Sequence, residues 1–69
     1  MTARESQIYT AIHDFITVNG YPPTFREIGS LVGLKSSSAV HYYLQKIRDK
    51  GHISYHPGKS RTLRVIQDD

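Results

Sequence analysis

Apolar residues recur at helical spacing along the first part of the chain. The first apolar stripe, which predicts a helix over about residues 4–19, comprises Ile8, Ala11, Ile12, Phe15 and Ile16. At its start, Thr2 and Glu5 fit a capping box, in which the hydroxyl accepts from the amide three residues on and the carboxylate reaches back. Asn19-Gly20 is expected to end this helix.

A second, shorter helix is predicted over about residues 25–33. Tyr21-Pro22-Pro23 forms a stiff extended connector, since proline fixes its own φ and disfavours helix before it. Thr24 and Glu27 repeat the capping box. The expected inward face of this helix comprises Ile28, Leu31 and Val32, and Gly33 is expected to end the helix. Gly29 inside the helix costs about 1 kcal/mol relative to alanine, so we expect another helix to approach closely there.

A third helix is predicted over about residues 37–50. Leu34 is expected to enter the core from the preceding turn, and Ser36 or Ser37 to cap the helix. The buried stripe comprises Val40, Tyr43, Leu44 and Ile47. Gly51 is expected to stop the helix in the left-handed conformation.

Beyond Gly51 the apolar period changes from helical to alternating. Ile53 and Tyr55, then Leu63 and Val65, alternate with polar residues on either side of a turn over residues 57–60, which predicts a hairpin of strands 52–56 and 61–66. The expected fold is therefore mainly α with a small β-hairpin: a winged helix-turn-helix of three helices. Residues 67–69 are expected to be frayed.

Composition limits the classes of function that remain open. With 69 residues the chain is expected to form a single domain over residues 1–69, and a domain of this size buries only about 60% of its unfolded surface. The absence of cysteine excludes a disulfide or thiolate zinc site and suits a reducing cytoplasm. Apolar runs are too short for a signal peptide or a membrane span.

The distribution of charge is more informative than the total. Residues 35–66 carry seven basic residues against Asp49 alone, a net charge of +6, whereas residues 1–34 carry a net charge of −1. A basic half suits a polyanionic partner on that side. Taken alone, the bias is equally compatible with a solvated basic surface.

The outward face of the third predicted helix suits base recognition in the major groove of DNA. This face comprises Ser36, Ser38, Ala39, His41, Tyr42 and Gln45. Small residues at a helix start let the backbone approach closely, Ala39 suits a thymine methyl, and Gln45 could pair with adenine. The alternative is an ordinary capped amphipathic helix.

The hairpin tip offers a second basic contact. Residues 58–61, including Lys59, Ser60 and Arg61, resemble wings that lie along the DNA backbone or enter a minor groove. Such contacts contribute mainly salt-dependent affinity that is independent of sequence. The competing interpretation is solubilising charge on a turn.

Metal binding and catalysis find little support. His52 and His56 lie about 13 Å apart along a strand, and His13 has no second ligand within reach. His41 beside the serines lacks an acid to orient it and a pocket around it. We therefore expect neither a cofactor nor an enzyme.

With these residues in place, the chain resembles the N-terminal DNA-binding domain of the LexA family of SOS-response repressors. The resemblance runs without gaps over residues 2 to about 66. It rests on Thr2-Ala-Arg4, Gly20-Tyr-Pro-Pro-Thr24, Glu27-Ile28, Val32-Gly-Leu34, Ser36-Ser-Ser38, Val40-His41, Leu44, Lys50-Gly51 and Ser60-Arg61. Tyr21-Pro-Pro23 and the run from Ser36 to His41 resemble the Gram-positive branch most.

The resemblance implies a repressor module that binds palindromic operators as a homodimer on DNA and is weak or monomeric without it. Base reading would fall on Ser36, Ser38, Ala39, His41 and Tyr42. Backbone contacts would fall on Arg4, Arg26, Lys50, Ser60 and Arg61, to which charge adds Lys35, Lys46 and Lys59. Such a protein would be cytoplasmic and associated with the bacterial nucleoid.

The sequence departs from the family pattern in two ways. The family's second half, with its Ala-Gly cleavage site and Ser/Lys self-cleaving domain, does not occur in these residues, so we expect either a piece of a longer repressor or a short phage- or plasmid-like protein. Tyr42-Tyr43 is also bulkier than the family's usual pair. An alternative function is a winged helix that docks a partner protein, through exposed Tyr9, Tyr21 and Tyr42.

Overall fold

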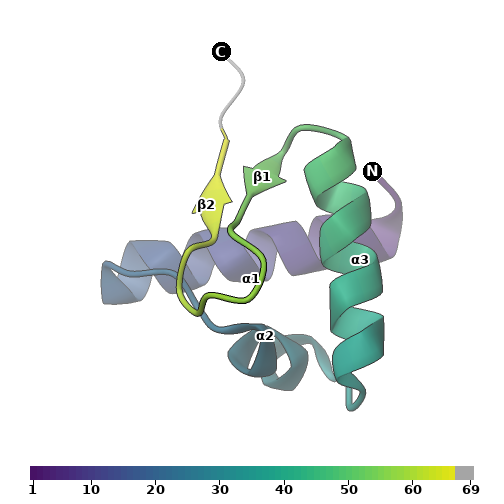
Figure 1. The fold of residues 1–69 in the computed structure, drawn as a ribbon, viewed down its shortest axis with the longest axis horizontal. Helices are drawn as coiled ribbons and strands as arrows, with labels where there is room; N and C mark the ends of the chain where they lie inside the picture. Colours follow the sequence, from purple (N-terminus) through teal and green to yellow (C-terminus); the bar gives the residue numbers. More distant parts are fainter. Residues whose placement is uncertain (67–69) are drawn as a thin grey trace.

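Three helices and a two-stranded antiparallel hairpin follow one another along the chain (Figure 1). The computed structural model describes residues 1–66; residues 67–69, predicted to be frayed, lie outside this range. The elements are α1 (Ala3–Asn19), α2 (Phe25–Val32), α3 (Ser37–Asp49), β1 (Ile53–Ser54) and β2 (Arg64–Val65). The predicted winged helix-turn-helix is confirmed, with each helix boundary within one residue of its expected position.

The strands of the hairpin are much shorter than predicted. Only Ile53 with Val65 and Ser54 with Arg64 pair in the ladder, against the expected strands 52–56 and 61–66. In the loop the Thr62 side chain takes the place of ladder bonds: its Oγ1 accepts from the His56 amide at 2.9 Å and lies 3.3 Å from the His56 carbonyl oxygen. A side chain that satisfies the backbone locally competes with strand pairing.

The first two helices begin with the predicted capping boxes. At α2 the Glu27 amide donates to Thr24 Oγ1 at 3.1 Å and the Thr24 amide donates to Glu27 Oε1 at 2.8 Å. Thr2 and Glu5 make the same pair of bonds at α1. Ser36 occupies the N-cap position of α3, as predicted, but its side chain makes no cap hydrogen bond.

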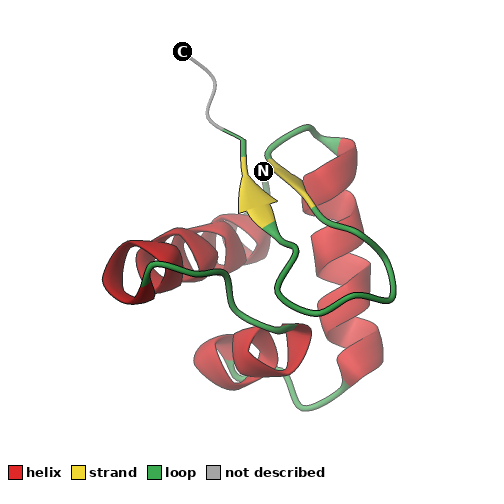
Figure 2. Cartoon of the chain, turned by 60° about the vertical axis from the view of Figure 1, so that its left-hand side comes forward, coloured by secondary structure: helices red, strands yellow, loops and turns green. Residues whose placement is uncertain are grey.

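The core lies where the three helices and the hairpin meet (Figure 2). Its buried apolar residues are Ile8, Ile12, Ile28, Val32, Val40, Leu44, Ile47, Ile53 and Leu63. Several predicted core residues are only half-buried and pack around it, among them Leu34 and Tyr43. Tyr9, which we expected to be exposed, is also half-buried and packs on this core, with its ring edge-on to His52.

The inward face of α2 differs from the predicted one. Leu31 was expected in the core but is 52% exposed, whereas Gly29 is buried. At 100° per residue, the face centred on Ile28, Gly29 and Val32 leaves Leu31 well to one side. The helix is rotated toward Gly29 because that is where α3 and the turn come closest.

The predicted close approach at Gly29 is confirmed. A Cβ atom at this position would lie 2.9 Å from the Leu34 carbonyl oxygen and 3.2 Å from Val40 Cγ2. The Leu34 amide also donates to the Gly29 carbonyl at 2.8 Å. Glycine therefore allows the backbone of α2 to touch both the turn and the start of α3.

No helix within residues 1–66 is both long and apolar enough to cross a membrane.

Candidate nucleic-acid interface

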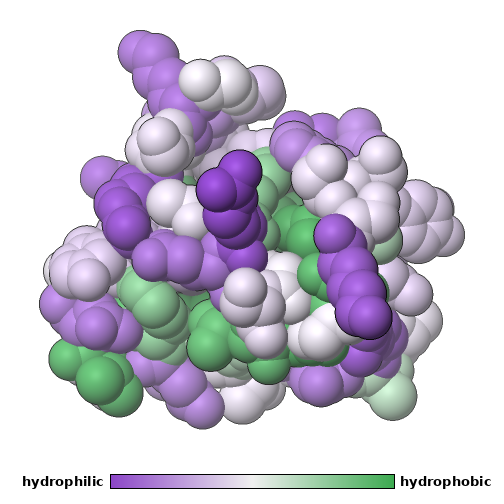
Figure 3. Space-filling view, turned by 90° about the horizontal axis from the view of Figure 1, so that it is seen from below, coloured by the Kyte–Doolittle hydropathy of each residue, from purple (hydrophilic) through white to green (hydrophobic). Residues whose placement is uncertain are grey.

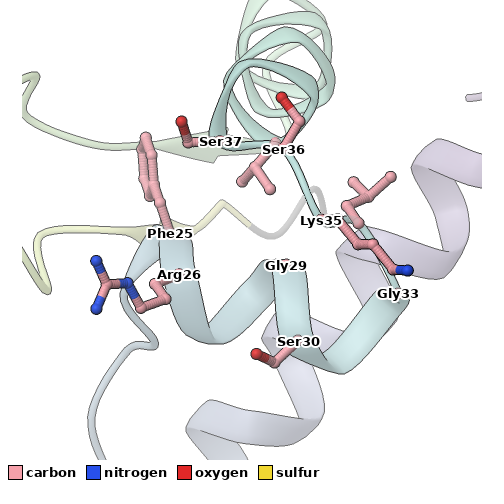
Figure 4. Close-up of a pocket in the computed structure, with 10 residues that line it drawn as sticks. Phe25, Arg26, Gly29, Ser30, Gly33, Lys35, Ser36 and Ser37 are labelled. Atoms are coloured by element: carbon pink, nitrogen blue, oxygen red, sulfur yellow. The ribbon is translucent and has the colours of Figure 1, made fainter.

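A short turn joins α2 to α3 and leaves the start of α3 open. Gly33 ends α2 in the left-handed conformation, with φ +75°, and three residues later Ser36 precedes α3. A groove between the two helices is lined by Phe25, Arg26, Gly29, Ser30, Gly33, Leu34, Lys35, Ser36, Ser37 and Val40. Figure 4 shows Arg26 and Lys35 on opposite sides of this groove, with Ser36 and Ser37 at the beginning of α3.

The electrostatics of the α3 start favour an anion. A helix N-terminus carries a partial positive charge and unpaired amides. Here no acidic residue lies in the first turn, in contrast to Glu5 and Glu27 in the other helices. Arg26 and Lys35 add full positive charges at the groove.

Four of the residues predicted to read bases share one exposed face of α3, namely Ser38, His41, Tyr42 and Gln45, and Ser36 and Ala39 flank the start of this helix. Ser36, Ser38, His41, Tyr42 and Gln45 are exposed, and Ala39 is half-buried. Ser38, His41 and Gln45 follow one another at helical spacing from the first turn onward, beside the buried Val40 and Leu44. The structure thus brings the predicted set together; contact with DNA by each of them stays a prediction.

His41 is supported from behind by Phe25, a residue that sequence reasoning missed. The two rings pack edge to face, with centroids 4.7 Å apart. Phe25 also packs edge-on to Tyr55 at 5.2 Å, and the Arg48 guanidinium lies 5.0 Å from the Tyr55 ring. Phe25 lies three residues before Ile28 and seven before Val32, at the helical spacing of one face. The periodicity could therefore have placed it on the inward side of α2, although not against His41.

Tyr42 stands beside its neighbours on the same exposed face. It is 56% exposed, packs edge-on to Tyr43 at 5.3 Å and has Lys46 Nζ 5.4 Å from its ring centroid. A phenol held this way presents a flat apolar surface and a hydroxyl next to a cation, which suits a base edge beside a phosphate.

The basic residues predicted to contact the DNA backbone are not equally free. Arg26, Lys35, Lys46, Lys59 and Ser60 are exposed, whereas Arg4 donates to Gln7 at 3.0 Å. Lys50 Nζ donates to Glu5 Oε1 at 2.6 Å, and Glu5 is only 5% exposed. This bond from Lys50 holds the pKa of the Glu5 carboxyl below its ordinary value. Lys50 therefore ties the end of α3 to the start of α1.

Arg61, predicted at the wing tip, points back onto the protein. Its guanidinium makes a two-point contact with the Glu27 carboxylate, at 3.0 and 3.3 Å, and donates to the Pro22 carbonyl at 3.0 Å. It also lies 4.8 Å from the Tyr21 ring centroid. The hydrogen bond from the Thr24 amide, together with Arg61, lowers the pKa of the Glu27 carboxyl.

The face over α2 and the start of α3 is mixed in polarity. Figure 3 shows hydrophilic side chains projecting across it, with hydrophobic ones between them in separate patches. Within residues 1–66 no three His, Cys, Asp or Glu side chains gather as a metal site would require. The chemistry available on this face is hydrogen bonding, positive charge and apolar contact.

Comparison with known proteins identifies the family. The model of the LexA DNA binding domain matches residues 1–62. LexA repressors of Staphylococcus aureus, from strains Mu3 and USA300, are 44% identical over 68 residues, which cover 99% of this chain and 33% of each relative. The chain thus spans about a third of the length of the curated relatives it matches.

Proposed function

The chain belongs to the LexA family through its DNA-binding domain, and from this membership we propose that it binds double-stranded DNA sequence-selectively and represses transcription. The observation that carries the proposal is the start of α3, where an exposed polar face and an N-terminus without an acidic residue lie on the basic half of the chain. We also propose that the whole chain forms one such domain and that its role is not enzymatic. Its proposed place of action is the bacterial nucleoid.

Base reading is proposed for the exposed face of α3. A recognition helix enters the major groove with its N-terminal residues at the base edges. His41 and Gln45 can donate and accept hydrogen bonds, and Ala39 can contact a thymine methyl. The full set proposed is Ser36, Ser38, Ala39, His41, Tyr42 and Gln45.

Backbone contacts are proposed for the basic and polar residues around this face. They would supply the salt-dependent share of affinity, because each neutralised phosphate releases counterions. Exposed Lys35 and Arg26 at the groove, and Lys59 on the wing, are the freest of them. The proposed set is Arg4, Arg26, Lys35, Lys46, Lys50, Lys59 and Ser60. Arg61, which we also expected in this set, bonds instead to Glu27 and to the Pro22 carbonyl.

Two copies are proposed to bind a palindromic operator. A single domain contacts one half-site and binds weakly, whereas two copies with half-sites about 34 Å apart, one helical turn, restore affinity. This proposal is supported by the family resemblance.

Selection of duplexes from a random-sequence library tests the proposal. The wild-type chain is expected to enrich a half-site sequence, and its affinity to fall steeply as salt is raised. His41→Ala should relax the preference at one position, while Lys59→Ala should weaken binding to all duplexes alike and reduce the salt slope by about one. A flat salt response, or equal affinity for selected and random duplexes, would contradict it.

A further inference from the structure

The loop of the wing carries one arginine that bonds to the helix-turn-helix. Arg61 lies in the hairpin loop, yet its guanidinium spans the start of α2, where it bonds to Glu27 and to the Pro22 carbonyl. The Tyr21 ring packs against its other side. Three groups from one short segment, residues 21–27, thus contact a side chain that lies 34 residues further along the chain than Glu27.

The backbone conformation of Arg61 also indicates that surrounding contacts hold this residue in place. Its φ is +56°, and among residues 1–66 it is the one non-glycine residue with positive φ. This region is uncommon for residues with a Cβ and persists where surrounding contacts hold it. The two-stranded ladder covers only two residue pairs, too little to fix the loop by itself.

We propose that Arg61 is a positioning residue, which fixes the wing against α2 through Glu27 so that Lys59 and Ser60 meet the DNA backbone, rather than itself a phosphate ligand. This rests on the proposed DNA binding and deepens it. Glu27 has two roles in this arrangement: one oxygen, Oε1, caps α2 and also accepts from Arg61, and Oε2 completes the two-point contact. A planar guanidinium fits such a contact, whereas an ammonium does not.

The proposal predicts an effect of opposite sign to simple electrostatics. Glu27→Gln removes a negative charge from the DNA-facing side, so electrostatics alone would strengthen binding to a polyanion. It would also free Arg61 for phosphate. If Arg61 positions the wing, the same substitution weakens binding, by about fivefold, the size expected for a half-exposed ion pair.

The experiment compares Glu27→Gln with the matched control Asp14→Asn, which removes one negative charge from an exposed site on α1. Glutamine can still complete a capping box, so α2 is retained, and thermal unfolding verifies this. Affinity is measured for the duplex that the wild type selects from a random library. Glu27→Gln is expected to bind about fivefold more weakly, and Asp14→Asn as tightly as wild type or slightly tighter.

Arg61→Lys separates charge from geometry. A phosphate ligand would retain most of its affinity as lysine, whereas a positioning residue loses affinity as Glu27→Gln does. The double variant should lose little more than either single one, because both remove the same contact. Affinity for Glu27→Gln equal to or above that of the wild type would overturn the proposal.

A measurement on the free protein keeps the two proposals apart. Backbone amide relaxation by NMR at residues 58–62 should show a more mobile loop in Glu27→Gln and Arg61→Lys, and an unchanged loop in Asp14→Asn and Lys59→Ala. An unchanged loop in the first two variants overturns the positioning role whatever the DNA result. A wild type that selects no duplex would instead contradict the proposed function, and the loop measurement would still decide the role of Arg61.

Discussion

The second and third helices begin in opposite ways, although only four residues separate them. The start of α2 is closed: Thr24 and Glu27 satisfy each other's amides, and Arg61 covers the carboxylate. The start of α3 is open, with no side-chain cap at Ser36 and Ala39 where α2 has its glutamate. Ser36 to Ser38 are all exposed.

This difference assigns a structural role to the start of α2 and leaves the start of α3 available for recognition. In a closed helix start the capping box satisfies two of the free amides, and these hydrogen bonds contribute to folding. An open start keeps its amides and its partial positive charge for a partner outside the chain. In the proposed function α2 therefore holds the turn and α3 meets DNA, and substitutions can test each half of the contrast.

The largest effect is expected from the buried side of α2. Ile28 is fully buried, so Ile28→Ala should lower the free energy of unfolding by about 2–5 kcal/mol. The matched substitution on α3, Ser38→Ala, should change it by less than about 0.5 kcal/mol and instead alter base preference. Chemical denaturation of both variants measures this, and a large loss of stability in Ser38→Ala would break the contrast.

Closing the start of α3 should cost DNA affinity and gain stability. Ala39→Glu places a carboxylate three residues after Ser36, which recreates the capping box of the other two helices. We expect stability to rise by about 0.3–1 kcal/mol and DNA affinity to fall about tenfold or more, since a charge is placed against phosphates and a base contact is lost. Unfolding and duplex binding are measured together.

Ala39→Gln is the control for this substitution, because it can make the same capping box without the charge. It should gain part of the stability and lose less affinity than Ala39→Glu. Equal losses of affinity in the two variants would show that side-chain size, rather than charge, governs this position.

Removing each cap should give unequal results. Thr24→Ala loses the hydrogen bond from the Glu27 amide and should cost about 0.5–2 kcal/mol of stability. Ser36→Ala removes no cap hydrogen bond and should be close to neutral for folding, while weakening DNA binding. Thermal unfolding of both variants measures the two losses of stability. A loss in Ser36→Ala as large as in Thr24→Ala would mean that the α3 cap forms in solution.

The smallest expected effect is on the pH dependence of folding stability, to which Glu27 at the start of α2 contributes and the start of α3 does not. Because Thr24 and Arg61 lower the pKa of Glu27 in the folded chain, its contribution to stability is present above the ordinary glutamate pKa of about 4.3. That contribution is lost as the pH falls through the lowered folded value. Denaturation between pH 7 and pH 3 should show a shallower decline in Glu27→Gln than in wild type.

Glu5 contributes in the same direction, through its bond to Lys50, so some decline should remain in Glu27→Gln. Ser36→Ala should leave the profile unchanged, since no carboxylate lies in the first turn of α3. A pH profile identical in Glu27→Gln and wild type would contradict the role assigned to the α2 start.

Much of this molecule could be predicted from short-range patterns. Periodicity and the two capping boxes located the helices within one residue, because these signals act over three or four residues. Gly29 could be predicted as a close approach, since a glycine inside a helix needs a reason of that kind. The face of α3 followed from its buried stripe.

The features that the sequence-based predictions missed depend on contacts between segments that are distant in the sequence. The rotation of α2 that exposes Leu31 is set by where α3 and the turn press on Gly29. The support of His41 by Phe25 joins two helices. The predicted strands were too long because Thr62 bonds across the loop to His56, a contact that alternation of apolar residues does not register.

By itself the sequence determined the order of elements, their ends, the basic half and the family, because caps, periods and charges are written in neighbouring residues. Only the tertiary structure decided that Arg61, although exposed, bonds to Glu27. The physical reason is that an arginine on a loop is equally suited to a phosphate and to a carboxylate. Which of them it meets depends on the groups that folding places beside it.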